Sequence, residues 1–443
     1  MRDGGCAAGE LLSAAPRVAL TGYNRRHLSA WARGEEMESA SMAISSSNAV
    51  PIRSSNESPL TEEMLTRFES RAATYDRENR FFEQDFEELR STKYLLLPVP
   101  KEFGGAGFTL EGMCREQRRL AYYAPATALG VNMHIYWLGV AADLWRRGDR
   151  SLEWILREAA AGEMFAAGHA EAGNDVPILL STSKAERVDG GYRFTGRKQF
   201  GSLTPVWTRL GLHAMDTSDP RQPKIVHAFM PRDSSGYIIK ETWDVLGMRA
   251  TRSDETILEN AFVPDRYIAR VVPAGGAGID GFVLSIFAWG LMGFANIYYG
   301  LAKRALDRCI DAAKTKKSVA LSRSMACHPE VQHAIAEMII ELESIEPHLE
   351  RITEDWSNGV DHGPAWPSKI FAAKYHAVEG AWRVVDRGLE VMGGYGIFRS
   401  VGYERILRDA RLGRIHPANS FLTHEVVAKT ALGITLDDQP RWG

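Results

Sequence analysis

The stretch that decides the fold lies near the C-terminus of the chain. It reads Val391-Met-Gly-Gly-Tyr-Gly-Ile397, then Tyr403-Glu-Arg-Ile-Leu-Arg-Asp-Ala-Arg411, then Ile415-His-Pro-Ala-Asn-Ser420. Three glycines in the first segment lack a Cβ, so the backbone of this turn can approach a phosphate closely. The Arg-rich run supplies cationic donors, and Pro-Ala-Asn-Ser is typical of a cap before a further helix. We interpret the stretch as a nucleotide-binding turn that follows one helix and precedes another.

Composition places the chain among ordinary globular enzymes. Its 443 residues are enough for two or three domains, with 45% hydrophobic and 25% charged residues. The net charge of −3 gives no reason to expect a nucleic-acid or membrane partner. The four cysteines are scattered without the spacing of a metal site, which predicts no metal and a reduced, cytoplasmic protein.

An uncharged stretch, residues 281–302, is long enough to cross a membrane. Lys303, Arg304 and Asp307 continue its helical pattern, and small and polar residues interrupt it. We therefore interpret it as a helix buried inside a bundle.

The periodicity of the chain divides it into five parts. Residues 1–56 show no sustained period and predict a disordered leader, with an alternative start at Met37 or Met42. Residues 57–161 are predicted to form an N-terminal helical domain, with Thr61 as an N-cap and a long apolar helix opening at Met133. Residues 162–272 carry short β-rich runs and an Asp-Gly-Gly hairpin signal, which predict a small antiparallel barrel or sandwich. Residues 279–435 are predicted to form a C-terminal four-helix bundle, and 436–443 a tail; the four bundle helices are expected at 282–314, 329–358, 366–392 and 419–432.

This order of elements, with the motifs above, resembles the acyl-CoA dehydrogenase superfamily over residues 58–435. The segment Trp243–Ser253, followed by Val263-Pro264, is similar to a signature of that superfamily. The resemblance implies an α+β multidomain fold: an N-terminal helical domain, a central antiparallel β-barrel or sandwich, and a C-terminal four-helix bundle. It also implies a flavin cofactor, FAD, or alternatively reduced FMN or FAD as a co-substrate.

Three segments resemble the flavin-binding segments of the family. The glycine-rich turn implies nucleotide contacts from Gly393, Gly394 and Gly396. The segment Phe165–Asp175 resembles the start of the flavin-binding β domain, although it is two residues shorter and carries an Ala where the family has Thr or Ser; it implies contacts from Gly168, His169 and Ala170. The segment Gly196–Ser202 places Phe200 beside the flavin ring and the Ser202 hydroxyl at its reactive nitrogen. Substrate contacts are predicted from Asn174 and Tyr395.

The catalytic base is where the chain departs from the family. The position of the usual catalytic Glu is occupied by Pro417, and the alternative Glu position on the first bundle helix matches Gly290. His416 is adjacent and could act as the base, because imidazole titrates near neutrality. The competing interpretation is that His416 only caps the last helix, in which case Glu171 is the next candidate. The Arg-x-x-Phe-Gly run that many relatives use to reach FAD across a dimer is absent, and residues 316–323 keep only its cations.

Three hypotheses about function follow. The first is α,β-dehydrogenation of an acyl-CoA or similar thioester with a nonstandard base and an electron-transfer partner. The second is a two-component monooxygenase that takes reduced flavin from a separate flavin reductase, because a His at this spacing also resembles that branch of the fold. The third is a catalytically silent homologue that binds flavin or CoA. The resemblance and the apolar bundle helix further imply a homodimer or homotetramer.

Overall fold

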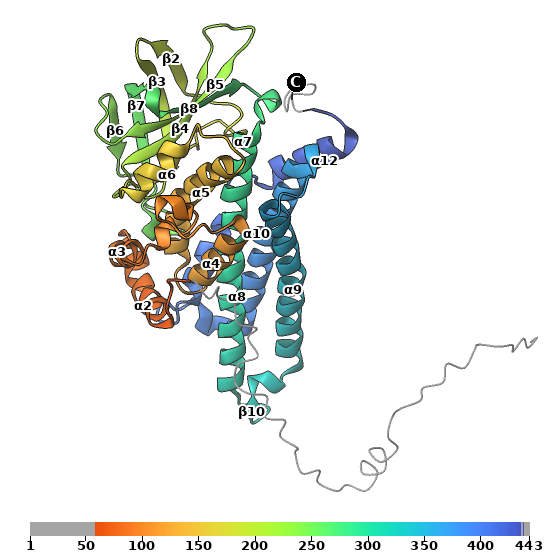
Figure 1. The fold of residues 1–443 in the computed structure, drawn as a ribbon. Helices are drawn as coiled ribbons and strands as arrows, with labels where there is room; N and C mark the ends of the chain where they lie inside the picture. Colours follow the sequence, from red (N-terminus) through yellow and green to blue (C-terminus); the bar gives the residue numbers. More distant parts are fainter. Residues whose placement is uncertain (1–57, 436, 438–443) are drawn as a thin grey trace, which may run out of the picture. The chain divides into compact units, whose positions relative to one another are not determined.

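The computed structural model describes residues 58–435 and residue 437 (Figure 1). The predicted leader, 1–56, and almost all of the predicted tail lie outside the described residues. The N-terminal helices are α2 (Glu62–Glu78), α3 (Glu83–Ser91), α4 (Leu110–Tyr123), α5 (Pro125–Arg146) and α6 (Glu153–Ala160). The strands are β1 (Phe165–Gly168), β2 (Lys184–Val188), β3 (Gly191–Gly201), β4 (Arg209–Asp216), β5 (Lys224–Pro231), β6 (Tyr237–Lys240), β7 (Asp254–Pro264) and β8 (Ile268–Pro273).

The C-terminal part is helical, as its periodicity predicts. It contains α7 (Gly281–Ile286), a π-helical turn (Phe287–Leu291), α8 (Met292–Thr315), α9 (Pro329–Ser357), α10 (Trp366–Met392), α11 (Tyr403–Leu412) and α12 (Ser420–Leu432). Helices α8, α9 and α10 run side by side and contact one another (Figure 1). The prediction missed α11, whose Tyr403, Ile406 and Ala410 are buried at helical spacing and which lies between the glycine-rich turn and α12.

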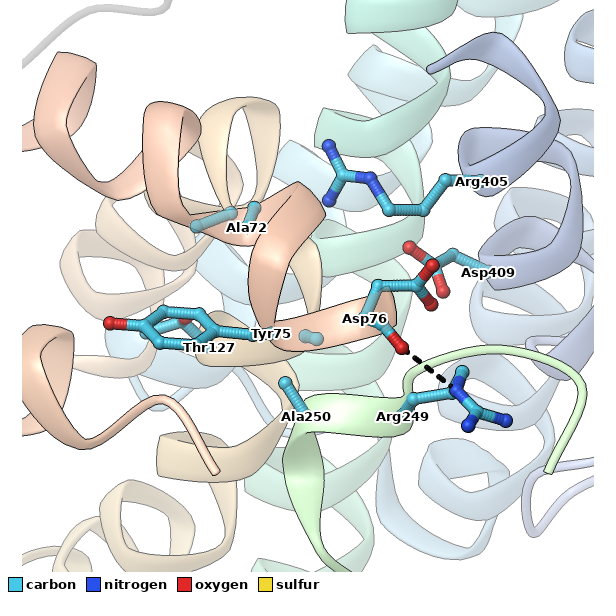
Figure 2. A pocket seen from close by; sticks show the side chains of 10 residues that line it. Ala72, Tyr75, Asp76, Thr127, Arg249, Ala250, Arg405 and Asp409 are labelled. Carbon is cyan, nitrogen blue, oxygen red and sulfur yellow. Dashed lines mark hydrogen bonds between the residues drawn. The ribbon is translucent and has the colours of Figure 1, made fainter. Parts of the chain in front are cut away.

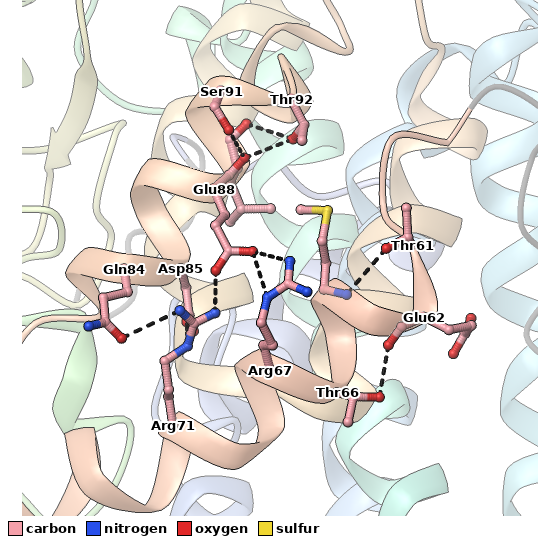
Figure 3. Close-up of polar contacts among 12 residues, drawn as sticks. Thr61, Glu62, Thr66, Arg67, Arg71, Gln84, Asp85, Glu88, Ser91 and Thr92 are labelled. Carbon is pink, nitrogen blue, oxygen red and sulfur yellow. Dashed lines mark hydrogen bonds and ion pairs between the residues drawn. The ribbon is translucent and has the colours of Figure 1, made fainter.

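Capping and ion pairs fix the first two helices. The Thr61 side chain accepts a hydrogen bond from the Met64 amide at 3.2 Å, so Thr61 is the N-cap of α2 as predicted. Figure 3 shows that Arg71 of α2 binds two carboxylates of α3, with its Nε 2.9 Å from Asp85 and its Nη2 2.7 Å from Glu88. The buried Asp85 also accepts from the Thr127 hydroxyl of α5 at 2.9 Å. These contacts join α2, α3 and α5 into one unit.

The long apolar helix begins earlier than predicted. Helix α5 starts at Pro125, not at Met133, and nearly all of its residues are buried. Proline is favourable in the first turn because its missing N–H would have no partner inside the helix. The polar Asn132 and His134 are buried within this helix and do not mark its beginning.

The β domain is one mixed sheet of eight strands. Its strand order is β6-β7-β3-β2-β4-β5-β8, and β1 pairs with β4 outside this path. The hairpin predicted at Asp-Gly-Gly joins β2 to β3, with Gly190 at φ +72° in the turn. The purely antiparallel arrangement was wrong in two places, because β1 and β2 each pair with β4 in parallel. The β2–β3 hairpin lies between β1 and β4 in the sequence, which provides the long connection that a parallel pair needs.

The apolar segment is buried in the helical bundle. The continuous helical stretch Gly281–Thr315 is long and apolar enough to cross a membrane, but 89% of its most apolar window is buried inside the protein. The interpretation as a core helix is therefore supported by the packing of α7 and α8 against α4, α5 and α10.

Candidate functional site

His416 lies in the connection between α11 and α12. Its ring stacks on Phe294 of α8, with centroids 4.7 Å apart, and its Nε2 is 2.9 Å from the Tyr298 hydroxyl. Burial, aided by the nearby charge of Lys374, lowers the pKa of His416 to about 3. The imidazole is therefore neutral at neutral pH. Asn419, whose side chain accepts from the Leu422 amide at 3.1 Å, is the N-cap of α12, so His416 is not the cap.

Open space adjoins the helix face that holds His416. Gly290, Phe294 and Tyr298 follow at four-residue spacing, which puts them on one face of the helix. Gly290 is buried in the π-helical turn, yet apart from its chain neighbours and the backbone of its own helix no atom of the described residues lies within 4 Å of the position where a Cβ would stand. Single π-helical turns occur frequently at functional sites. This space has no carboxylate at either family position, because the residues there are Gly290 and the exposed Pro417.

Lys374 of α10 holds the loop that carries His416. Its ammonium is fully buried and donates to the backbone carbonyls of Gly413, His416 and Ala418, each at 3.1 Å. Burial lowers the pKa of Lys374 to about 7, against the opposing attraction of Glu379. The sequence analysis missed Lys374 and Tyr298, because a single Lys or Tyr in an apolar helix carries no motif that links it to a distant loop.

Glu171 is fully engaged inside the β domain, which removes it as the fallback base. Its carboxylate forms a buried ion pair with Lys198 at 2.5 Å and accepts from the Ser181 and Ser183 hydroxyls at 2.7 and 2.5 Å. Burial would raise the pKa of Glu171, but the Lys198 ammonium and these hydrogen bonds outweigh it and hold the pKa near 2. Asn174 also donates to this carboxylate at 2.9 Å and to the Leu180 carbonyl at 2.7 Å, so its amide is engaged by other described residues, and its contact with substrate stays a prediction.

The two predicted flavin-ring segments meet in the structure. Gly168 ends β1, and the Gln199 amide at the end of β3 donates to the Ala170 carbonyl at 2.9 Å. This bond sets the first segment beside the strand that leads to Phe200. Between them, the partly buried His169 ring packs near Tyr136, whose hydroxyl is 3.4 Å from its Nδ1. Burial keeps the pKa of His169 well below its usual value, so this ring is also neutral.

The groups around Phe200 and Ser202 fit a planar conjugated ring with carbonyl oxygens. The Phe200 side chain is 56% exposed and meets Trp243 edge-on, with centroids 6.0 Å apart. The buried Trp243 Nε1 has no hydrogen-bond partner among the described residues, which leaves one donor available. Ser202 is buried, and its hydroxyl lies 2.7 Å from that of Ser253. An aromatic face with a few hydrogen-bonding groups beside it is typical of sites that bind planar ring ligands.

The glycine-rich turn follows α10 as a short 3₁₀-helix, Gly393–Ile397, with contacts to α10 and α11. Gly393 has a φ of +60°, a backbone conformation that residues with a Cβ rarely adopt. At Gly396 a side chain would clash, because its Cβ would lie 2.7 Å from the Cβ of Met392. Gly394 faces open space instead, which leaves room for a ligand. Lys316 adds a cation there, with its Nζ 4.7 Å from the ring of the exposed Tyr395. Open space beside the Lys316 ammonium leaves room for an anionic group such as a phosphate.

A small pocket lined by both apolar and charged side chains marks the junction of the helical and β parts (Figure 2). Asp76 of α2, Arg249 of the β domain, and Arg405 and Asp409 of α11 line it. The Arg249 Nε donates to the Asp76 carbonyl at 2.9 Å, and the buried Asp409 accepts from the Met248 amide at 2.5 Å. Arg249 thus has a structural contact, and α11 ties the β domain to the loop that carries His416.

Comparisons with known proteins agree with this architecture. A family model for the C-terminal domain of acyl-CoA dehydrogenase matches residues 278–429. The chain is 26% identical over 368 residues to YdbM of Bacillus subtilis, and the match covers 82% of this chain and 93% of YdbM. The name of YdbM assigns it provisionally to the acyl-CoA dehydrogenases. It is also 26% identical over 390 residues to the amino sugar nitrososynthase DnmZ of Streptomyces peucetius, covering 84% of this chain and 92% of DnmZ.

Two solved structures share the fold. KijD3, in complex with FMN and a dTDP-linked amino-keto sugar, superposes with a TM-score of 0.75 at 22% identity, covering 85% of this chain and 93% of KijD3. Butyryl-CoA dehydrogenase from Megasphaera elsdenii superposes with a TM-score of 0.72 at 16% identity, covering 84% of this chain and 99% of that enzyme. The similar proteins include dehydrogenases and, by their names, a dibenzothiophene monooxygenase and a methanesulfinate monooxygenase.

Proposed function

Because this chain belongs to the acyl-CoA dehydrogenase superfamily, we propose that it is a flavin-dependent oxidoreductase of the reduced-flavin monooxygenase type. The observation that carries the proposal is the neutral His416 beside a space that lacks a carboxylate at both family positions. Removal of a proton α to a thioester needs a base whose pKa is matched to the task. An imidazole with a pKa of about 3 is too weak a base for that step.

The same imidazole is suited to hydrogen bonding with a substrate. In the tautomer in which the Tyr298 hydroxyl donates to Nε2, at 2.9 Å, the proton of His416 stays on Nδ1. The Nδ1–H can then orient a substrate that occupies the space beside Gly290. Phe294 holds the ring from one side, and Lys374 fixes its backbone carbonyl at 3.1 Å. A bound reduced flavin would supply the two electrons that activate molecular oxygen.

Flavin contacts are proposed in two groups. Phe200, Ser202 and the segment Gly168–Ala170 would contact the ring, and Gly393, Gly394 and Gly396 would contact phosphate. The glycine-rich turn contacts α10 and α11 of its own chain, and its Gly394 side is open. We therefore propose a homodimer or homotetramer in which this turn contacts a flavin nucleotide that is also bound by a second subunit. A flavin reductase is the proposed redox partner, and the proposed location is the cytoplasm.

Dehydrogenation of an acyl-CoA with an electron-transfer partner remains the second candidate. It is favoured by the Gly-Gly-x-Gly turn, which looks more like the dehydrogenase branch than the monooxygenase branch. A catalytically silent flavin- or CoA-binding homologue is the third.

One experiment separates these candidates. Purified protein is scanned for bound flavin, then supplied with FMN or FAD, a flavin reductase and NADH in air, together with a panel of amines, thioethers and phenols. Substrate-dependent formation of an oxygenated product supports the proposal. Bleaching of bound FAD by an acyl-CoA without oxygen, and no oxygenated product in air, refutes it in favour of dehydrogenation. Binding of neither flavin, in either redox state, leaves only the silent homologue.

A further inference from the structure

Three buried hydroxyl groups form a hydrogen-bonded chain that starts at Ser202. The Ser202 Oγ is 2.7 Å from Ser253 Oγ, and Ser253 Oγ is 2.7 Å from Thr251 Oγ1. Thr251 Oγ1 donates to the Met248 carbonyl oxygen at 2.9 Å. All three hydroxyl residues are buried. Met248 is held in place from the other side, because its amide donates to Asp409 of α11 at 2.5 Å.

The end of this chain sets the direction of every hydrogen bond in it. A carbonyl oxygen only accepts, so the single hydroxyl proton of Thr251 is committed to Met248. Ser253 must then donate to Thr251, and Ser202 must donate to Ser253. The proton of Ser202 is therefore used inside the protein. Its Oγ can offer only a lone pair to a bound ligand.

We propose that Ser202 is an obligate hydrogen-bond acceptor that makes the site select reduced over oxidised flavin. Reduced flavin carries a proton on the reactive N5 and donates there, whereas N5 of oxidised flavin is an acceptor. A lone pair of Ser202 Oγ accepts a hydrogen bond from N5–H of reduced flavin. The same lone pair repels the N5 lone pair of oxidised flavin. The inference rests on the proposed function, which places Ser202 at that nitrogen.

This selection deepens the proposed function because it concerns exchange of the flavin. A flavin that arrives reduced from a reductase and leaves oxidised is best held by a site that favours the reduced state. The direction of these hydrogen bonds is therefore consistent with a flavin that is exchanged as a co-substrate.

The test compares dissociation constants of oxidised and anaerobically reduced FMN, and separately of FAD, for the wild-type protein and variants. A mismatched polar contact in a buried site changes affinity by about tenfold or more, so the wild type is expected to bind reduced flavin at least about tenfold more tightly. A tenfold preference raises the two-electron midpoint potential of the bound flavin by about 30 mV. Ser253→Ala removes the acceptor of the Ser202 proton and is expected to abolish the preference. Thr251→Val releases the Ser253 proton toward Ser202 and should have the same effect.

Two control variants separate the effect of hydrogen-bond direction among the three hydroxyls from general damage to the site. Thr251→Ser keeps the hydroxyl and should keep the preference. Thr204→Val removes a neighbouring buried hydroxyl that donates to the Gly201 carbonyl at 2.6 Å outside the chain, and should also keep it. Equal affinity of the wild type for both redox states, or unchanged ratios in Ser253→Ala and Thr251→Val, would overturn this inference while oxygenation stands. Oxygenation assays that fail while the preference holds would instead overturn the proposed reaction.

Discussion

Replacement of Lys374 by Met tests how the His416 loop is held. Burial lowers the pKa of Lys374 from 10.5 to about 7. The unfolded chain keeps this proton up to about pH 10, whereas the folded protein releases it near pH 7, so between these values the unfolded state binds more protons. Stability of the wild type must therefore rise with pH through this window. Integrated from pH 7 to pH 9, the contribution of this one group is about 2 kcal/mol.

The assay is urea unfolding of wild type and Lys374→Met at pH 7 and pH 9. The wild type is expected to gain about 2 kcal/mol relative to the variant on going from the lower to the higher pH. Lys303→Met serves as a control, because that ammonium pairs with Asp307 on the same helix at 2.9 Å and is not enclosed among carbonyls. Its free energy of unfolding should run parallel to that of the wild type. If the free energy of unfolding of Lys374→Met also changed with pH in parallel with that of the wild type, the buried position of the ammonium would be refuted.

The same variant should loosen the loop that Lys374 binds. Without its three hydrogen bonds to the carbonyls of residues 413, 416 and 418, the ring of His416 is expected to become hydrated. Its pKa should then rise from about 3 toward 6.5, because both the burial and the Lys374 charge that lower it are lost. NMR titration of the histidine ring measures this shift. A pKa that stays near 3 in the variant would mean that α8 alone positions the ring.

Three further predictions concern the site and the β domain. His416→Ala should lower turnover by about 10²-fold, because the substrate loses the Nδ1–H that orients it, while flavin content is kept because Phe200 and the glycine-rich turn remain; full turnover of the variant would exclude a role for the ring. His227→Leu should make the protein less sensitive to acid: burial lowers the pKa of His227 to about 3, so its share of stability, present above pH 6.5, is lost as the pH falls. The loss amounts to about 2 kcal/mol by pH 5, and identical acid unfolding of wild type and variant would contradict it. Glu171→Gln leaves the buried Lys198 without its partner and should destabilise the protein by about 3–5 kcal/mol in thermal unfolding, with a shift below 1 kcal/mol counting against the ion pair.

Local signals were sufficient to predict much of the architecture. The Thr61 cap, the Asp-Gly-Gly hairpin and the amphipathic bundle helices depend on residues within a few positions of one another, so they can be read along the chain. The segments around Ala170 and Phe200 were predicted to lie together, and the Gln199–Ala170 hydrogen bond joins them. The cap, the hairpin and the helices follow from backbone geometry and side-chain periodicity, whereas the meeting of these two segments was implied by the family resemblance.

Only the tertiary structure decided the chemistry of the site. The sequence indicated that a carboxylate is missing at Pro417 and Gly290, but not that His416 is neutral, because its pKa depends on burial against Phe294 and on the charge of Lys374. Likewise, the acceptor role of Ser202 follows from a chain that ends at a carbonyl on a different segment. Proton affinity and hydrogen-bond direction are properties of surroundings assembled from distant parts of the chain, so no local pattern encodes them.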